Sequence, residues 1–185
     1  GVAEYYRRHT DRQSLRVIPN AIHPGRVASV PRAFARRRYG LSPDDVVFCS
    51  IGRVTEQKNP FGLLAGFEQA VVRYPGLLLF LVGPDDKSVR VNTLKRRFPD
   101  LFSSGAVRHI GRVEDVGTVL SAADGFVSNS FYEGWSVAAS EAAWSGLPLV
   151  LSETGGSAEL VGEHGERGIL VPNPCGSLFD VTQDT

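Results

Sequence analysis

Short apolar runs alternate with longer amphipathic segments along most of this chain. The runs of strand length are Leu15–Ile18, Val46–Ile51, Leu77–Val82, Ala106–Ile110, Gly125–Ser128, Pro148–Leu151 and Gly168–Val171. Val46–Ile51 and Leu77–Val82 are rich in Val, Ile, Leu and Phe and lack polar alternation, which is typical of strands buried on both faces. The pattern therefore predicts a parallel β-sheet covered by helices on both sides.

Segments with helical periodicity lie between these runs. They are Pro31–Tyr39, Pro60–Arg73, Val89–Phe98, Val113–Ala122 and Trp135–Ser145. In Pro60–Arg73 the apolar residues Phe61, Leu64, Phe67 and Val71 recur every three or four positions, so this helix has one face to bury. We expect an α/β fold, a Rossmann-like doubly wound parallel sheet, in which residues 1–185 form one domain.

Charge and cysteine content narrow the class of protein. The 185 residues carry 20 Lys and Arg against 20 Asp and Glu, so no net charge favours nucleic acid or an anionic membrane. The two cysteines, Cys49 and Cys175, give neither a disulfide framework nor metal-ligand spacing. The longest apolar run, Leu77–Val82, is far shorter than the roughly 20 residues that span a bilayer, and no signal peptide opens the sequence. We expect a cytoplasmic protein that binds a small ligand and no nucleic acid.

Two carboxylates stand out in the segment from Ser128 to Glu141. Glu133 and Glu141 are eight residues apart, which on a helix corresponds to roughly 12 Å, comparable with the distance from a hexose to a ribose across a diphosphate. The amides of Gly134, Trp135, Ser136 and Val137, at the expected start of the helix, suit phosphate oxygens. The structural alternative is that Glu133 stabilises the helix dipole and Glu141 is solvated.

A second segment places cations beyond the end of an apolar strand. Arg53 and Lys58 follow Val46–Ile51, and the loops at the carboxyl ends of parallel strands are where ligands bind in open sheets. These cations can neutralise a departing diphosphate, and Gly52 allows its backbone to approach closely. No G-x-G-x-x-G occurs, which argues against a nicotinamide or flavin dinucleotide.

Motifs over nearly the whole chain resemble the C-terminal domain of glycosyltransferase family 4, the group 1 retaining transferases of the GT-B fold. The resemblance rests on Val17–Ile22, the Gly52–Lys58 loop, Leu81–Gly83, Ile110–Val113, Glu133 and Glu141, Glu141–Pro148, Thr154–Val161 and Gly168–Pro172, taken in order. Each motif alone is modest, but their order and spacing make the combination specific.

The resemblance implies a role for each site residue. Arg53 and Lys58 contact the donor diphosphate and stabilise the leaving group, while Glu141 binds ribose hydroxyls. Glu133 faces the donor sugar, so Arg53, Lys58 and Glu133 are the expected catalytic residues. Donor binding also involves Gly52, the backbone amides of residues 134–137, and Arg112 with Val113 beside the nucleotide base. No cofactor and no metal are expected.

This chain departs from the family pattern at one place in the site. Trp135 and Ser136 stand where many relatives have an aromatic residue followed by glycine, which keeps the amide donors and alters the room for the sugar. Other residues have structural explanations: His109 at a strand end is expected to be a hydrogen-bonded structural histidine, and residues 36–38, all Arg, a solvated helix face. Asp85 and Asp86 resemble a turn rather than a metal site.

The expected activity is transfer of a sugar from a nucleotide diphosphate donor to an acceptor hydroxyl with retention. The sequence begins at Gly1 and contains no methionine, and Gly1–Arg12 resembles a helix with no strand before it. We therefore expect a fragment, inactive alone, whose N-terminal acceptor domain is absent. That domain would bind an acceptor glycan, lipid or small molecule, and the full-length enzyme is compatible with peripheral association with the inner face of the membrane. A nucleotide-sugar epimerase of the same fold and a non-catalytic nucleotide-sugar-binding module are the alternatives.

Overall fold

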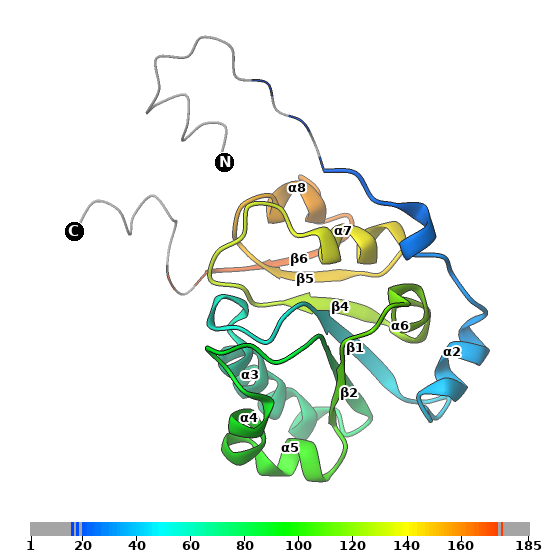
Figure 1. The fold of residues 1–185 in the computed structure, drawn as a ribbon, viewed down its shortest axis with the longest axis vertical. Helices are drawn as coiled ribbons and strands as arrows, with labels where there is room; N and C mark the ends of the chain where they lie inside the picture. Colours follow the sequence, from blue (N-terminus) through cyan, green and yellow to red (C-terminus); the bar gives the residue numbers. More distant parts are fainter. Residues whose placement is uncertain (1–15, 17, 19, 174, 176–185) are drawn as a thin grey trace.

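The computed structural model describes residues 16, 18, 20–173 and 175. Within them, six parallel strands form one sheet in the order β3-β2-β1-β4-β5-β6. The strands are β1 (Val46–Ile51), β2 (Leu77–Val82), β3 (Val107–Gly111), β4 (Gly125–Ser128), β5 (Leu149–Ser152) and β6 (Gly168–Val171). The expected parallel, Rossmann-like sheet is therefore confirmed (Figure 1).

Helices cover both faces of the sheet. They are α2 (Arg32–Arg38), α3 (Pro60–Arg73), α4 (Val91–Arg97), α5 (Pro99–Ser103), α6 (Val116–Ala122), α7 (Val137–Trp144) and α8 (Ser157–Val161), with 3-10 turns η1 (Pro24–Arg26) and η2 (Glu56–Lys58). The short helices α5 and α8 were not predicted, and the expected helix over residues 89–98 is confined to α4. The predicted strand over residues 15–18 lies partly outside the described residues, and the described Arg16 and Ile18 are not in a strand.

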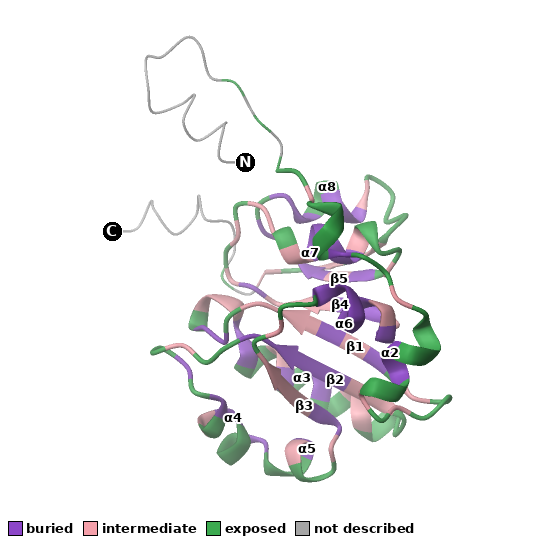
Figure 2. Cartoon of the chain, turned by 45° about the vertical axis from the view of Figure 1, so that its right-hand side comes forward, coloured by how far each residue is buried: buried purple, intermediate pink, exposed green. Residues whose placement is uncertain are grey.

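The core consists of two layers, one on each side of the sheet. The layer under α6, α7 and α8 includes Val47, Cys49, Phe80, Phe126, Leu149 and Leu151. The layer under α3, α4 and α5 includes Leu64, Phe67, Leu79, Leu81, Leu94 and Val107. Because neighbouring residues of β2 alternate between these layers, both faces of that strand are buried (Figure 2).

Two details of the expected burial were wrong. Val46 of β1 is 46% exposed, and Phe48 borders an apolar groove between α3 and the strands β4, β5 and β6, so β1 is only partly covered on that face. Phe61 is exposed, whereas Leu64 and Phe67 are buried, because only the latter two project from α3 into the layer beneath it.

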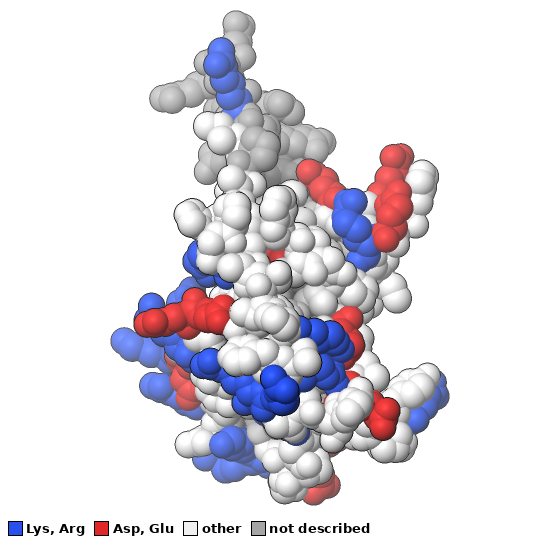
Figure 3. All heavy atoms as spheres, turned by 90° about the vertical axis from the view of Figure 1, so that its right-hand side faces the viewer, with Lys and Arg blue, Asp and Glu red and all other residues white. Residues whose placement is uncertain are grey.

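The expectation of a fully solvated arginine face on α2 was also partly wrong. Arg37 and Arg38 are exposed. Figure 3 shows Lys and Arg side chains gathered on one face of the molecule. Arg36 is buried and donates to the backbone oxygens of Ser42 at 2.6 Å and Asp45 at 2.8 Å. It turns inward because these carbonyls, at the loop entering β1, need hydrogen-bond donors.

The strand order creates a switch point in the sheet. The chain runs outward from β1 through β2 to β3, then returns to β4 beside β1 and continues to β5 and β6. The loops after β1 and β4 therefore diverge at the carboxyl edge, which is where open α/β sheets bind their ligands. Those two loops carry Arg53, Lys58 and Glu133.

Candidate functional site

The loop after β1 is held by backbone contacts with the end of β2 and the loop that follows it. The Gly52 amide donates to the Val82 carbonyl at 2.8 Å, and the Val54 amide donates to the Pro84 carbonyl at 3.0 Å. Gly83 approaches Gly52 so closely that a Cβ at Gly83 would overlap the Gly52 carbonyl oxygen. The loop after β1 therefore lies directly against the loop after β2.

Lys58 is fixed by the start of α3. It ends η2, and the next residue, Asn59, adopts a left-handed conformation with φ of 47°. The Asn59 side chain accepts the Gly62 amide at 3.1 Å and caps α3, while Pro60 occupies the first turn. The Lys58 side chain lies over Gly52, where a Cβ would come within 3.3 Å of its Cε atom.

Lys58 and Glu133 form an ion pair between the β1 and β4 loops. Their side chains are 27% and 14% exposed, and the Ser130 hydroxyl lies 3.5 Å from the same Glu133 oxygen. The Phe131 amide donates to the Gln57 carbonyl at 2.8 Å, which ties the loops together beside the pair. The structure thus brings these two predicted residues together at the switch point between β1 and β4.

Arg53 lies at the same edge and pairs with a different carboxylate. Its Nη1 is 3.3 Å from Oδ2 of Asp86, and its side chain is 67% exposed. The pKa of Asp86 is lowered mainly by a hydrogen bond from the backbone amide of Ser88, and less strongly by the Ser88 hydroxyl and the charge of Arg53. Asp86 is therefore an anion next to Arg53 at neutral pH, a partner that sequence reasoning missed.

Glu133 is not on the helix, so the helical spacing of about 12 Å expected between it and Glu141 was wrong. α7 begins at Val137, and Ser136 is its N-cap, whose Oγ accepts the Ala139 amide at 3.2 Å. Glu133 belongs instead to the loop that leads from β4 to the helix. The expected helix over residues 135–145 was therefore too long at its start.

The loop after β5 explains why Glu133 stays off the helix. The Gly156 amide donates to the Gly134 carbonyl at 3.1 Å, and the Trp135 ring lies against Gly156 with no room for a Cβ between them. A Cβ at Gly155, which has φ of 47°, would overlap the carbonyl oxygens of Glu133 and Gly134. This glycine pair lets the two loops approach each other and fixes the carbonyl oxygens of Glu133 and Gly134 against the loop after β5.

Backbone donors remain at the start of α7. Within the described residues, the amides of residues 134–137 donate to no protein acceptor. They are Gly134, Trp135, Ser136 and Val137, the donors proposed for phosphate oxygens. Backbone amides without an acceptor in the described part of the chain, at and just before the start of a helix, can donate hydrogen bonds to an anion.

Glu141 is buried in α7 rather than solvated. Its side chain is 3% exposed, and its carboxylate Oε1 lies 3.2 Å from Nε of Arg26 in η1. Arg26 was not among the predicted site residues, because the sequence contains no signal that brings η1 beside α7.

The remaining predicted residues lie near the end of β3. Arg112 is exposed and Val113 packs against the core in the loop before α6, so a place beside the nucleotide base stays a prediction. His109 Nε2 lies 2.8 Å from the Gly83 carbonyl oxygen, which confirms its structural assignment. Within the described residues no three His, Cys, Asp or Glu side chains cluster as metal ligands, and no helix has the length and apolarity to cross a membrane.

Comparisons with known proteins identify relatives of this chain. It is 32% identical over 171 residues to the lipopolysaccharide core biosynthesis glycosyltransferase LpsE of Rhizobium meliloti, covering 92% of this chain and 47% of that protein. It is 27% identical over 177 residues to the UDP-Gal:alpha-D-GlcNAc-diphosphoundecaprenol alpha-1,3-galactosyltransferase of Escherichia coli, covering 93% and 45%. The chain thus spans about half the length of these curated relatives.

Solved structures share its fold. The sucrose-phosphate synthase of Thermosynechococcus elongatus superposes with a TM-score of 0.74 at 28% identity, covering 92% of this chain and 43% of that one. WaaG, a glycosyltransferase involved in lipopolysaccharide biosynthesis, superposes with a TM-score of 0.76 at 20% identity, covering 94% and 47%. The family model for glycosyl transferases group 1 matches residues 31–177. This chain therefore belongs to the glycosyl transferases group 1 family.

Proposed function

We propose that this chain is the nucleotide-sugar-binding domain of a retaining glycosyltransferase that transfers a hexose to an acceptor hydroxyl. The observation that supports the proposal is the convergence of Lys58, Glu133 and the unpaired amides of residues 134–137 at the switch point. Its sequence relatives carry the names of glycosyltransferases, and one of them is named for a UDP-galactose donor.

The proposed chemistry is mainly electrostatic assistance to the leaving group. Negative charge grows on the nucleotide diphosphate as the bond to the sugar breaks, and Lys58, Arg53 and the amides before α7 stabilise that charge. Both cations are paired with carboxylates in the free domain. A bound diphosphate would therefore take over from Asp86 at Arg53, while Glu133 would turn from Lys58 toward hydroxyls of the donor sugar.

The acceptor and the closed reaction site belong to a second domain in this proposal. We propose that an acceptor glycan, lipid or small molecule is bound there, and that this chain alone binds donor without transferring sugar, because a water-excluding site needs both halves. The metal-free mechanism is part of the proposal, since two cations and a set of amides already supply positive charge.

Two measurements test the proposal. Calorimetric titration of residues 1–185 with UDP, GDP and ADP should reveal binding of at least one, and binding of none would refute it. The two-domain enzyme, incubated with donor and acceptor, should give a product with the anomeric configuration of the donor by NMR. Inversion would refute retention, and a change in the donor sugar without acceptor would indicate an epimerase instead.

A further inference from the structure

Glu141 is a carboxylate buried among the apolar side chains of α7. Its side chain is 3% exposed, and the neighbouring Ala139 and Ala142 are fully buried in the core. A buried carboxylate is costly unless a partner compensates for the lost water. Within the described part of the chain, Arg26 is the side chain that forms an ion pair with it.

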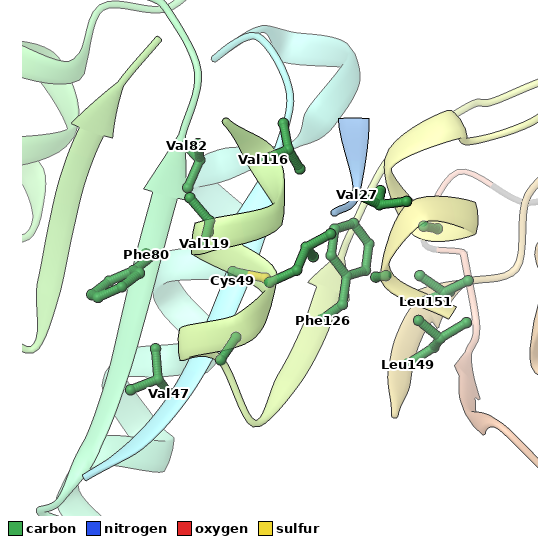
Figure 4. Close-up of a cluster of buried hydrophobic side chains, with 14 of the residues drawn as sticks. Val27, Val47, Cys49, Phe80, Val82, Val116, Val119, Phe126, Leu149 and Leu151 are labelled. Atoms are coloured by element: carbon green, nitrogen blue, oxygen red, sulfur yellow. The ribbon is translucent and has the colours of Figure 1, made fainter. Parts of the chain in front are cut away.

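The segment that carries Arg26 is anchored to the domain. Val27, the next residue, is buried and points between α6 and α7 toward Phe126 (Figure 4). The Ala28 carbonyl oxygen lies so close to Gly117 of α6 that a Cβ at Gly117 would overlap it. Since its neighbours are fixed, the Arg26 guanidinium is presented to Glu141 from a defined backbone position although its own side chain is 61% exposed.

The contact between the two groups leaves acceptor capacity on the carboxylate. It joins Nε of Arg26 to Oε1 of Glu141 at 3.2 Å. A carboxylate has about four lone-pair sites, so one guanidinium contact leaves positions for two hydroxyl donors.

We propose that Arg26 is a positioning residue of the nucleoside site. It fixes the Glu141 carboxylate through Oε1 and directs the remaining lone pairs toward the vicinal hydroxyls of the ribose. This inference rests on the proposed function, because it requires that Glu141 faces a nucleotide. The segment before α2, at one edge of the domain, would then help the site to bind a ribose more tightly than a sugar that lacks those hydroxyls.

The test compares a nucleoside diphosphate with its 2′,3′-dideoxy analogue by calorimetry on residues 1–185. The diphosphate used is whichever of UDP, GDP and ADP binds the unchanged chain most tightly. Hydrogen bonds to a charged group predict that the unchanged chain prefers the ribose form by about tenfold or more. Arg26→Gln should reduce this preference toward one. Arg26→Lys should leave an intermediate preference, because it keeps the charge but lacks the planar guanidinium group.

Arg32→Gln is the matched control. Arg32, the first residue of α2, also pairs with a carboxylate: its Nη2 is 2.6 Å from Oδ1 of Asp124. Glu141 is not part of that pair. We expect the ribose preference of Arg32→Gln to equal that of the unchanged chain. Circular dichroism of each variant checks that it is folded before binding is measured.

The outcomes separate this inference from the proposed function. If the unchanged chain binds none of the three diphosphates, the proposed function fails. If Glu141→Gln abolishes the ribose preference while Arg26→Gln retains it in full, the proposed function stands and the role of Arg26 is refuted. If Arg26→Gln does not fold, Arg26→Lys decides, and an unchanged preference in that variant refutes the inference.

Discussion

Replacing Gly155 with alanine tests whether the loop after β5 holds Glu133 in the site. At this position φ is 47°, and an added Cβ would overlap the carbonyl oxygens of Glu133 and Gly134. Two costs follow: a left-handed conformation costs an L-residue roughly 1–2 kcal/mol, and forcing extra volume into a packed contact costs about 1–3 kcal/mol. The expected loss of unfolding free energy is therefore about 2–5 kcal/mol.

Gly146→Ala provides the comparison that isolates the steric contribution. Gly146 has φ of 78°, and an added Cβ there meets nothing within 4 Å, so this variant should lose only the conformational roughly 1–2 kcal/mol. The effect of alanine on the unfolded chain is similar in both and cancels. At about 2–4 °C for each kcal/mol in a domain of this size, Gly155→Ala should melt roughly 2–12 °C below Gly146→Ala.

The two variants should also differ in ligand binding. Displacing the backbone at Glu133 and Gly134 moves the carboxylate away from Lys58 and shifts the amides before α7, so Gly155→Ala should bind nucleotide diphosphate more weakly by calorimetry. Gly146→Ala should bind like the unchanged chain. Equal melting temperatures and equal affinities for the two variants would refute the reasoning, because the loop after β5 would then have room to yield.

Three further outcomes are expected. In the two-domain enzyme, steady-state kinetics should show that Lys58→Ala lowers kcat more than donor affinity, because negative charge grows on the diphosphate during the reaction. Glu141→Ala should mainly raise the donor KM, because the ribose is unchanged by the reaction. The reverse pattern would contradict these roles. Arg36→Ala should lose more than about 2 kcal/mol in urea unfolding, because it removes hydrogen bonds of a charged group to the carbonyls of Ser42 and Asp45 and the ion pair with Asp124. Arg37→Ala should stay within about 0.5 kcal/mol. Equal losses would show that the contacts of Arg36 contribute little. Burial raises the pKa of the Cys49 thiol to about 12, so a thiol reagent should modify Cys49 only when the protein unfolds. Rapid labelling of Cys49 in the folded protein would contradict the core packing.

Local patterns in the sequence were sufficient for the strands and for the loops that carry the site. The strands β1, β2, β4 and β6 match the predicted bounds, and the predicted runs corresponding to β3 and β5 differ from the structure by one residue at each end. β1 and β2 in particular were predictable because strands in the middle of a sheet covered by helices are apolar along most of their length, which is a pattern of consecutive residues. The cations Arg53 and Lys58 follow from the same logic, since they come directly after such a strand.

The position of Glu133 in the loop before α7 could not be predicted from the sequence. The sequence predicts a helix over residues 135–145, but the helix begins only at Val137, and the glycines after β5 lie against the carbonyl oxygens of Glu133 and Gly134 in the loop before it. That contact joins residues about twenty positions apart, and tertiary contacts of this kind override local helix preference.

The charged partners were likewise decided by the tertiary structure. Arg26 and Glu141 are more than a hundred residues apart in sequence and meet because η1 is anchored over α6 beside α7. Arg36 is buried and Arg37 exposed, although the sequence around them shows only a run of arginines. The sequence by itself determined which segments are strands and which loops carry charge. The strand order and the close approaches of glycine backbones determined which charged side chains form pairs, because ion pairs depend on distances in space that no local sequence pattern specifies.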